Sequence, residues 1–87
     1  MENLHNIEGL YAITPEENNL SLLKAQVESA IKGGAKFVQY RSKILSKKHR
    51  KEQAGEIKKV CDCYQIPLII NDDIELCSIL DADGVHL

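Results

Sequence analysis

Apolar and polar positions alternate with two different periods along this chain, and the changes of period divide it into strands and helices. Residues 9–14 are mostly apolar and stop at Pro15, as a short strand would. From residue 20 to 32 the apolar positions recur every three or four residues, which predicts one buried helix face. The pair Gly33-Gly34 is expected to end that helix, because glycine is favoured at helix C-termini.

The rest of the chain repeats this strand and helix alternation. The expected elements are a strand at residues 36–42, a helix at 47–64 capped by Ser46, a strand at 68–71, a helix at 73–80 and a strand at 82–87. The strand at 68–71 is apolar on both faces, which favours a parallel sheet covered by helices. The order β-α-β-α-β-α-β therefore predicts one α/β domain over residues 1–87, with parallel strands and right-handed crossovers.

Two architectures fit this order, an open doubly wound sheet and part of a (β/α)8 barrel. Both place their ligands at the carboxyl ends of the strands. No glycine-rich loop of the GxGxxG or GxxxxGK[ST] kind follows any expected strand. The absence of such a loop weakens the case for a nucleotide-binding open sheet.

Polar side chains stand at every second position where the second strand ends. Because alternate strand residues face opposite sides, Gln39, Arg41 and Lys43 should share one face, with Val38 and Tyr40 on the other. Two cations and an amide on one face suit an anion with several oxygens, such as a phosphate or diphosphate. An edge strand with one wet face explains the same pattern, and both interpretations stay open.

Three further polar residues, Asn71, Asp72 and Asp73, follow the third strand and should lie near Arg41 and Lys43. A carboxylate at this place suits Mg²⁺, which prefers oxygen ligands and often bridges to substrate phosphates. Helix capping is the alternative role. Capping is favoured for Asp73, whereas both roles remain open for Asp72.

Composition narrows the class of protein without naming it. The net charge of -2 over 87 residues argues against a dedicated nucleic-acid binder. Neither a membrane-spanning run nor a secretory leader is recognisable, so a cytoplasmic protein is expected. An odd number of cysteines suggests reduced thiols, and the C-x-C pair Cys61 and Cys63 is expected to be small helix residues, buried or half-buried, rather than a metal or redox site.

Four segments together resemble the thiamine phosphate synthase family. They are Gly-Leu-Tyr-x-Ile-Thr at 9–14, Gly-Gly-Ala-x-x-Val-Gln-Tyr-Arg-x-Lys at 33–43, Pro-Leu-Ile-Ile-Asn-Asp at 67–72 and Ala-Asp-Gly-Val-His-Leu at 82–87. The resemblance implies a (β/α)8 TIM barrel, of which this chain would form about the N-terminal half. It also implies a transferase that joins a hydroxymethylpyrimidine diphosphate to a thiazole phosphate and releases pyrophosphate.

The resemblance also assigns roles to residues of this chain. The implied substrate-binding set is Gln39, Tyr40, Arg41, Ser42, Lys43 and Asn71. Within that set, Arg41 and Lys43 would also assist the reaction, and Asp72 would bind Mg²⁺. The implied mechanism is dissociative and needs neither a general base nor a covalent nucleophile.

The chain departs from the family pattern after Leu87, where the family continues with a Gly-Gln-x-Asp segment that supplies a second Mg²⁺ ligand. A truncated chain without activity is therefore one expectation. A homo-oligomer, or a partner chain that completes the barrel, is another, because an open half-barrel leaves sheet edges and an apolar face uncovered. A non-catalytic phosphate-binding module and a relative of thiazole tautomerase are the alternative functions.

Overall fold

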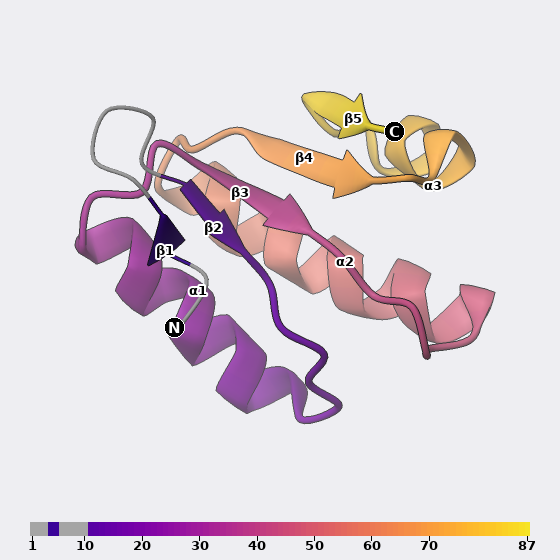
Figure 1. Cartoon of the computed structure of the whole chain (residues 1–87), viewed down its shortest axis with the longest axis horizontal. Helices are drawn as coiled ribbons and strands as arrows, with labels where there is room; N and C mark the ends of the chain where they lie inside the picture. Colours follow the sequence, from indigo (N-terminus) through magenta and orange to yellow (C-terminus); the bar gives the residue numbers. More distant parts are fainter. Residues whose placement is uncertain (1–3, 6–10) are drawn as a thin grey trace.

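The computed structural model describes residues 4–5 and 11–87, which form one sheet with helices packed against it (Figure 1). The elements are β1 (Leu4–His5), β2 (Tyr11–Ile13), α1 (Leu20–Lys32), β3 (Phe37–Tyr40), α2 (Lys47–Cys63), β4 (Leu68–Asn71), α3 (Ile74–Leu80) and β5 (Gly84–His86). The three helices agree with the sequence prediction to within a residue at each end. The predicted strand residues 9 and 10 lie outside the described part of the chain.

Strand order in the sheet follows chain order, from β1 to β5. Each of β3, β4 and β5 pairs parallel to the strand before it, which confirms the predicted parallel α/β fold. β1 was not predicted, and it pairs antiparallel to β2. The described sheet therefore has β1 along one edge and β5 along the other.

The core lies between the sheet and its helices. Figure 1 shows α1 and α2 on one face of the sheet. The side chains buried between the layers are Leu23, Val27, Val38, Tyr40, Ala54, Ile57, Cys61, Leu68, Ile70 and Leu76. Leu23, Val27, Ile57 and Cys61 belong to the expected apolar helix stripes. The strand residues in this core alternate along β3 and β4, because alternate side chains of a strand point to the same face of the sheet.

Each helix begins at a polar side chain that accepts a backbone N–H. Asn19, Ser46 and Asp73 cap α1, α2 and α3 in this way, accepting from Leu22, His49 and Leu76 respectively. The Ser46 cap and the favoured capping role of Asp73 are thereby confirmed. At the end of α1, Gly34 has a φ of 111°, a conformation that glycine adopts without strain, so the predicted glycine stop is also confirmed.

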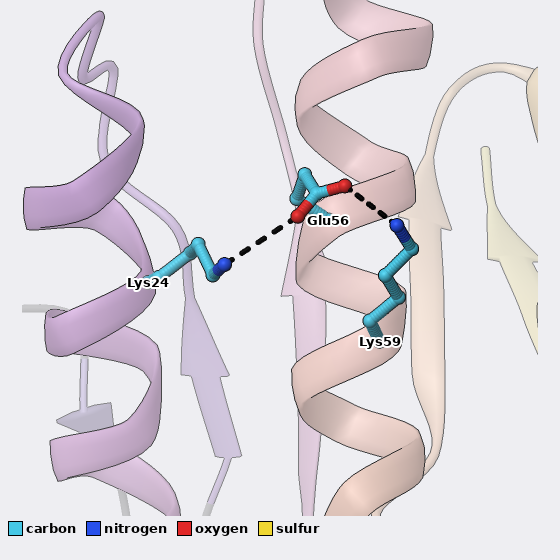
Figure 2. Close-up of polar contacts among 3 residues, drawn as sticks. All are labelled: Lys24, Glu56 and Lys59. Carbon is cyan, nitrogen blue, oxygen red and sulfur yellow. Dashed lines mark hydrogen bonds and ion pairs between the residues drawn. The ribbon is translucent and has the colours of Figure 1, made fainter.

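An ion-pair chain joins α1 to α2 on the outside of the helix layer (Figure 2). The Glu56 carboxylate of α2 accepts from Lys24 of α1 at 3.4 Å and from Lys59 of its own helix at 2.9 Å. These two lysines lower the pKa of Glu56, the hydrogen bond from Lys59 first. All three side chains are partly or largely exposed, so solvent screens the pairs and their contribution to stability is small.

The opposite face of the sheet carries no helix in the part of the chain that the structure describes. Tyr11 and Phe37 stack there with ring centroids 5.0 Å apart. Ile69 of β4 is only half-buried, so the expectation that this strand is buried on both faces is wrong for the chain alone. The physical reason is that no helix of the described residues covers the face on which Ile69 lies. Leu68 and Ile70 point to the face that the helices cover, and they are fully buried.

The three cysteines are free thiols. Cys61 is buried in the core, as expected, and desolvation raises the pKa of its thiol to about 12. Cys63 is exposed, which corrects the expectation of a buried or half-buried side chain, because it lies on the outer face of α2.

Among the described helices, none combines the length and the apolar composition that a membrane span requires.

Candidate functional site

Two of the predicted site residues follow directly on the carboxyl ends of β3 and β4, which lie side by side in the sheet. Arg41 comes immediately after Tyr40, the last residue of β3, and Asp72 immediately after Asn71, the last residue of β4. Parallel pairing of these strands brings both ends to the same edge of the sheet. The candidate site therefore occupies the edge where barrels and open α/β sheets bind ligands.

Gln39 and Asn71 are brought into direct contact. The Asn71 amide donates to the Gln39 side-chain oxygen over 2.9 Å, although the residues are 32 positions apart in sequence. Gln39 is nearly buried, with 8% of its surface exposed. The parallel-sheet prediction that the two strand ends lie close together is confirmed for this pair.

Strand β3 is shorter than predicted, because it ends at Tyr40 rather than at residue 42. Beyond Tyr40, the Arg41 N–H donates to the hydroxyl of Thr14 over 2.9 Å instead of to a strand carbonyl. A side chain thus takes the place of the next ladder bond, and regular alternation stops. Arg41 and Lys43 lie exposed in the following loop. The prediction that they share one strand face with Gln39 is therefore wrong.

The cationic loop at residues 41–43 already holds an internal anion. One Glu16 carboxylate oxygen accepts the Ser42 hydroxyl at 3.1 Å, and the other accepts the backbone N–H of Lys43. Within the described residues, the Arg41 guanidinium and the Lys43 ammonium make neither an ion pair nor a side-chain hydrogen bond. Both cations are therefore available to a ligand, whereas the Ser42 hydroxyl is occupied by Glu16.

Tyr40 points to the helix side of the sheet, opposite to Gln39. Its hydroxyl donates to the Gln53 side chain of α2 at 2.7 Å, and only 1% of the residue is exposed. Burial is the main reason why the pKa of Tyr40 rises to about 12. A contact between Tyr40 and a ligand at the strand ends would have to come from its backbone.

The two aspartates after β4 have different environments. Asp72 has a φ of 54°, in the left-handed region, and its N–H donates to the His86 carbonyl of β5 over 2.6 Å. Its carboxylate is exposed, and within the described residues it has no hydrogen-bond or ion-pair partner. Asp73, by contrast, is committed to capping α3 and lies 3.9 Å from the Arg50 guanidinium. Asp72 is thus the carboxylate that remains free for a metal.

Sequence reasoning missed three residues that shape this edge, namely Thr14, Glu16 and Gln53. Gln53 is buried on α2, where it accepts from Tyr40 and donates to the Glu17 carbonyl over 2.6 Å. Of these three residues, only Gln53 has a signal in the sequence, because it is a glutamine within an otherwise apolar helix stripe. Thr14 and Glu16 make their contacts across 27 and 26 positions, which no local pattern reveals.

A hollow in the described surface lies between α2 and α3. It measures about 420 Å³ and is lined by Lys47, Lys48, Lys51, Asp73, Glu75, Leu76 and Ile79. These residues belong to the two helices and the α3 cap, and Gln39, Arg41 and Asn71 are not among them. The candidate site itself lies at the carboxyl ends of β3 and β4.

Comparison with known proteins decides the family. The family model for thiamine monophosphate synthase matches residues 10–87. The chain belongs to this family. It is 51% identical over 81 residues to the thiamine-phosphate synthase of Methylobacillus flagellatus, an alignment that covers 93% of this chain and 39% of that protein. It is 48% identical over 81 residues to the thiamine-phosphate synthase of Nitrosospira multiformis, covering 93% and 35% respectively.

Members of this family are TIM barrels, so the four parallel strands of this chain fit the start of such a barrel. The chain spans about two fifths of the length of the relatives it matches, and the alignments cover their N-terminal part. The family resemblance seen in the sequence is therefore confirmed. The residues in the matched region include Gln39, Arg41, Lys43 and the pair Asn71-Asp72.

Proposed function

We propose that this chain provides the diphosphate-binding part of a thiamine phosphate synthase. The reaction would join a hydroxymethylpyrimidine diphosphate to a thiazole phosphate. The observation that carries the proposal is the contact between Asn71 and Gln39 next to two uncommitted cations, Arg41 and Lys43. An amide pair and free cations at the carboxyl edge of a parallel sheet suit a multiply charged phosphate ester.

In the proposed reaction the bond between the pyrimidine methylene carbon and the diphosphate oxygen breaks first. The electron pair leaves with the diphosphate, and the thiazole nitrogen then forms the new bond to the carbon with its lone pair. Negative charge grows on the leaving oxygen during this step. Arg41 and Lys43 would stabilise that charge, because fixed cations aimed at developing charge lower the barrier most.

The residues at the strand ends fit a Mg²⁺ ion that binds together with a phosphate. Among the described residues no group of three histidine, cysteine or acidic side chains could hold a metal alone. Mg²⁺ commonly keeps several waters and uses one or two carboxylates plus substrate phosphates. Asp72, with its free exposed carboxylate, is the ligand we propose. The ion, when bound, would neutralise charge on the diphosphate.

The open face of the sheet supports a proposed assembly that completes the barrel. Among the described strands β5 has a neighbour on one side only, and its Val85 is 36% exposed. The stacked rings of Tyr11 and Phe37 lie on the face without helices. A second copy or a partner chain would cover this face, and sedimentation of the purified protein at several concentrations tests for self-association.

The test of function separates binding from turnover. Calorimetry with pyrophosphate and Mg²⁺ measures the anion site, and mass spectrometry detects thiamine phosphate after incubation with both substrates. Arg41→Ala is expected to weaken pyrophosphate binding roughly 10-fold or more, as for a lost charge-assisted hydrogen bond. Asp72→Asn keeps a residue that tolerates the left-handed backbone and should remove the Mg²⁺ dependence.

Lys32→Ala is the matched control for Arg41→Ala. It removes one exposed positive charge at the end of α1, where the chain turns towards the start of β3. Its binding should equal that of the unaltered chain. Binding without product would favour a non-catalytic phosphate-binding module, and the absence of pyrophosphate binding would contradict the proposed function altogether.

A further inference from the structure

We propose that Thr14 and Glu16 are positioning residues that hold the cationic loop, residues 41–43, in the shape that binds a diphosphate. The inference rests on the proposed function and deepens it. Both residues belong to the segment between β2 and α1, so a neighbouring part of the chain shapes the loop that would touch the substrate. Neither Thr14 nor Glu16 is proposed to contact the anion itself.

Thr14 fixes the backbone on both sides of the Arg41 side chain. Its hydroxyl accepts the Arg41 N–H at 2.9 Å and donates to the Arg41 carbonyl at 3.3 Å. The Thr14 N–H in turn donates to the Gln39 carbonyl at 2.9 Å. Thr14 is 2% exposed, so water does not compete for these bonds. The guanidinium of Arg41 is exposed, while its backbone is held in place.

Glu16 makes the second attachment. Its two carboxylate oxygens accept the Ser42 hydroxyl and the Lys43 N–H, so each oxygen holds a different residue of the loop. The Lys43 ammonium takes no part in either bond. Glu16 therefore restrains the backbone at Lys43 and leaves the charged end of that side chain for a ligand.

The segment that carries both residues is itself anchored. Gln53, buried on α2, donates to the Glu17 carbonyl at 2.6 Å and accepts the Tyr40 hydroxyl at 2.7 Å. A helix residue thus ties the β2–α1 segment to β3 just before the cationic loop begins. The attachment points of the loop are parts of a rigid framework rather than of a second free loop.

The energetic argument is one of pre-organisation. A free loop would lose backbone freedom when it bound an anion, and this loss would reduce affinity. Thr14 and Glu16 order the loop during folding instead. Because Glu16 is itself an anion on the loop, the rival expectation is that a diphosphate displaces it. The two ideas predict opposite effects of removing its charge.

Three variants of the full chain and one control variant test the inference by calorimetry with pyrophosphate and Mg²⁺. Thr14→Val keeps the shape of the side chain and removes the hydroxyl, and it should weaken binding about tenfold. Thr14→Ser restores the hydroxyl and should bind within about twofold of the unaltered chain. Glu16→Gln should weaken binding severalfold, whereas Glu56→Gln, the same change on the helix layer, should have no effect.

A readout specific to one substrate separates positioning from general stability. Where the assembled protein turns over, Thr14→Val should raise KM for the pyrimidine diphosphate and leave KM for the thiazole phosphate unchanged. Glu16 is exposed, so Glu16→Gln tests the inference even if Thr14→Val does not fold. Tighter pyrophosphate binding by Glu16→Gln would overturn the inference in favour of displacement.

The remaining outcomes distinguish the two proposals. If the unaltered chain binds pyrophosphate, and Thr14→Val and Glu16→Gln bind equally well, the positioning inference is wrong and the proposed function stands. If the unaltered chain does not bind pyrophosphate, the proposed function fails and the positioning role fails with it.

Discussion

The side-chain amide of Asn71 on β4 donates a hydrogen bond to the side-chain oxygen of Gln39 on β3 over 2.9 Å. This bond uses the only acceptor of the Gln39 amide and leaves its NH₂ group as a donor. The contact therefore orients Gln39 so that it presents hydrogen-bond donors, as an anion site requires. Asn71 would act on a diphosphate through Gln39 as well as directly.

Asn71→Ala should lower both stability and anion binding. The nearly buried oxygen of Gln39 would lose its partner, and an unsatisfied buried acceptor costs roughly 1–3 kcal/mol. Chemical denaturation measures the loss in the free energy of unfolding, and pyrophosphate calorimetry measures the loss of affinity. An unchanged free energy of unfolding would show that the bond is not formed in solution.

Asn71→Asp separates these two effects. A carboxylate at position 71 accepts but does not donate, so the Gln39 amide is expected to rotate and donate to it. Stability should then be lowered less than in Asn71→Ala, because Gln39 keeps a partner. Pyrophosphate binding should be weaker than in Asn71→Ala, because Gln39 would present its oxygen and the new charge repels the anion. Equal binding by the two variants would contradict the orienting role.

The two long helices of this protein were predictable because each carries a repeated apolar stripe of its own. The helix at 20–32 and the cap at Ser46 needed only local information, since a side chain and the N–H groups three residues later lie in one segment. Strand ends needed more. β3 stops at Tyr40 because Thr14 accepts the next N–H, and that partner lies 27 positions away.

The site was predictable in part for the same reason. Parallel pairing alone brings the end of β3 next to the end of β4, so the proximity of Gln39 and Asn71 followed from the order of elements. The sequence does not indicate that Ser42 donates to Glu16, because the two residues lie 26 positions apart and no local pattern links them. The roles of the individual site residues remain predictions.

Tyr40→Phe should destabilise the fold and weaken anion binding less than Thr14→Val does, because Thr14 and Glu16 still hold the loop directly. The Gln53 oxygen would lose its buried partner, at a cost of roughly 1–3 kcal/mol in the free energy of unfolding. A double-mutant cycle with Gln53→Leu isolates the hydrogen bond, and the double variant should lose less than the sum of the single losses. A fall in pyrophosphate affinity as large as that of Thr14→Val would contradict a purely supporting role of the Tyr40 hydroxyl.

Asp73→Ala should lower stability through the loss of a helix cap. The Asp73 carboxylate accepts the Leu76 N–H at 2.9 Å, and replacing such a cap by alanine typically costs about 1 kcal/mol. Asp73→Asn keeps an accepting oxygen and should retain most of the stability. The neighbouring Asp72→Asn serves as the control, because Asp72 caps no helix, and thermal unfolding compares the three variants.

Alkaline pH should destabilise the protein from about pH 9 upward. Burial raises the pKa of Cys61 from 9.0 to about 12, and that of Tyr40 from 10.0 to about 12. Between these values the unfolded chain has released its protons and the folded chain has kept them, so the free energy of unfolding falls as pH rises. Below pH 9 the contribution of both groups is complete.

Two matched variants assign this alkaline loss to its sources. Cys61→Ala should flatten the fall in stability between pH 9 and 12, and Tyr40→Phe should flatten only the part above pH 10. Cys63→Ala is the control, since it makes the same change at an exposed position of the same helix. A thiol reagent should likewise modify Cys63 in the folded protein and Cys61 only after unfolding. Stability that stays constant up to pH 12 would contradict the burial of both groups.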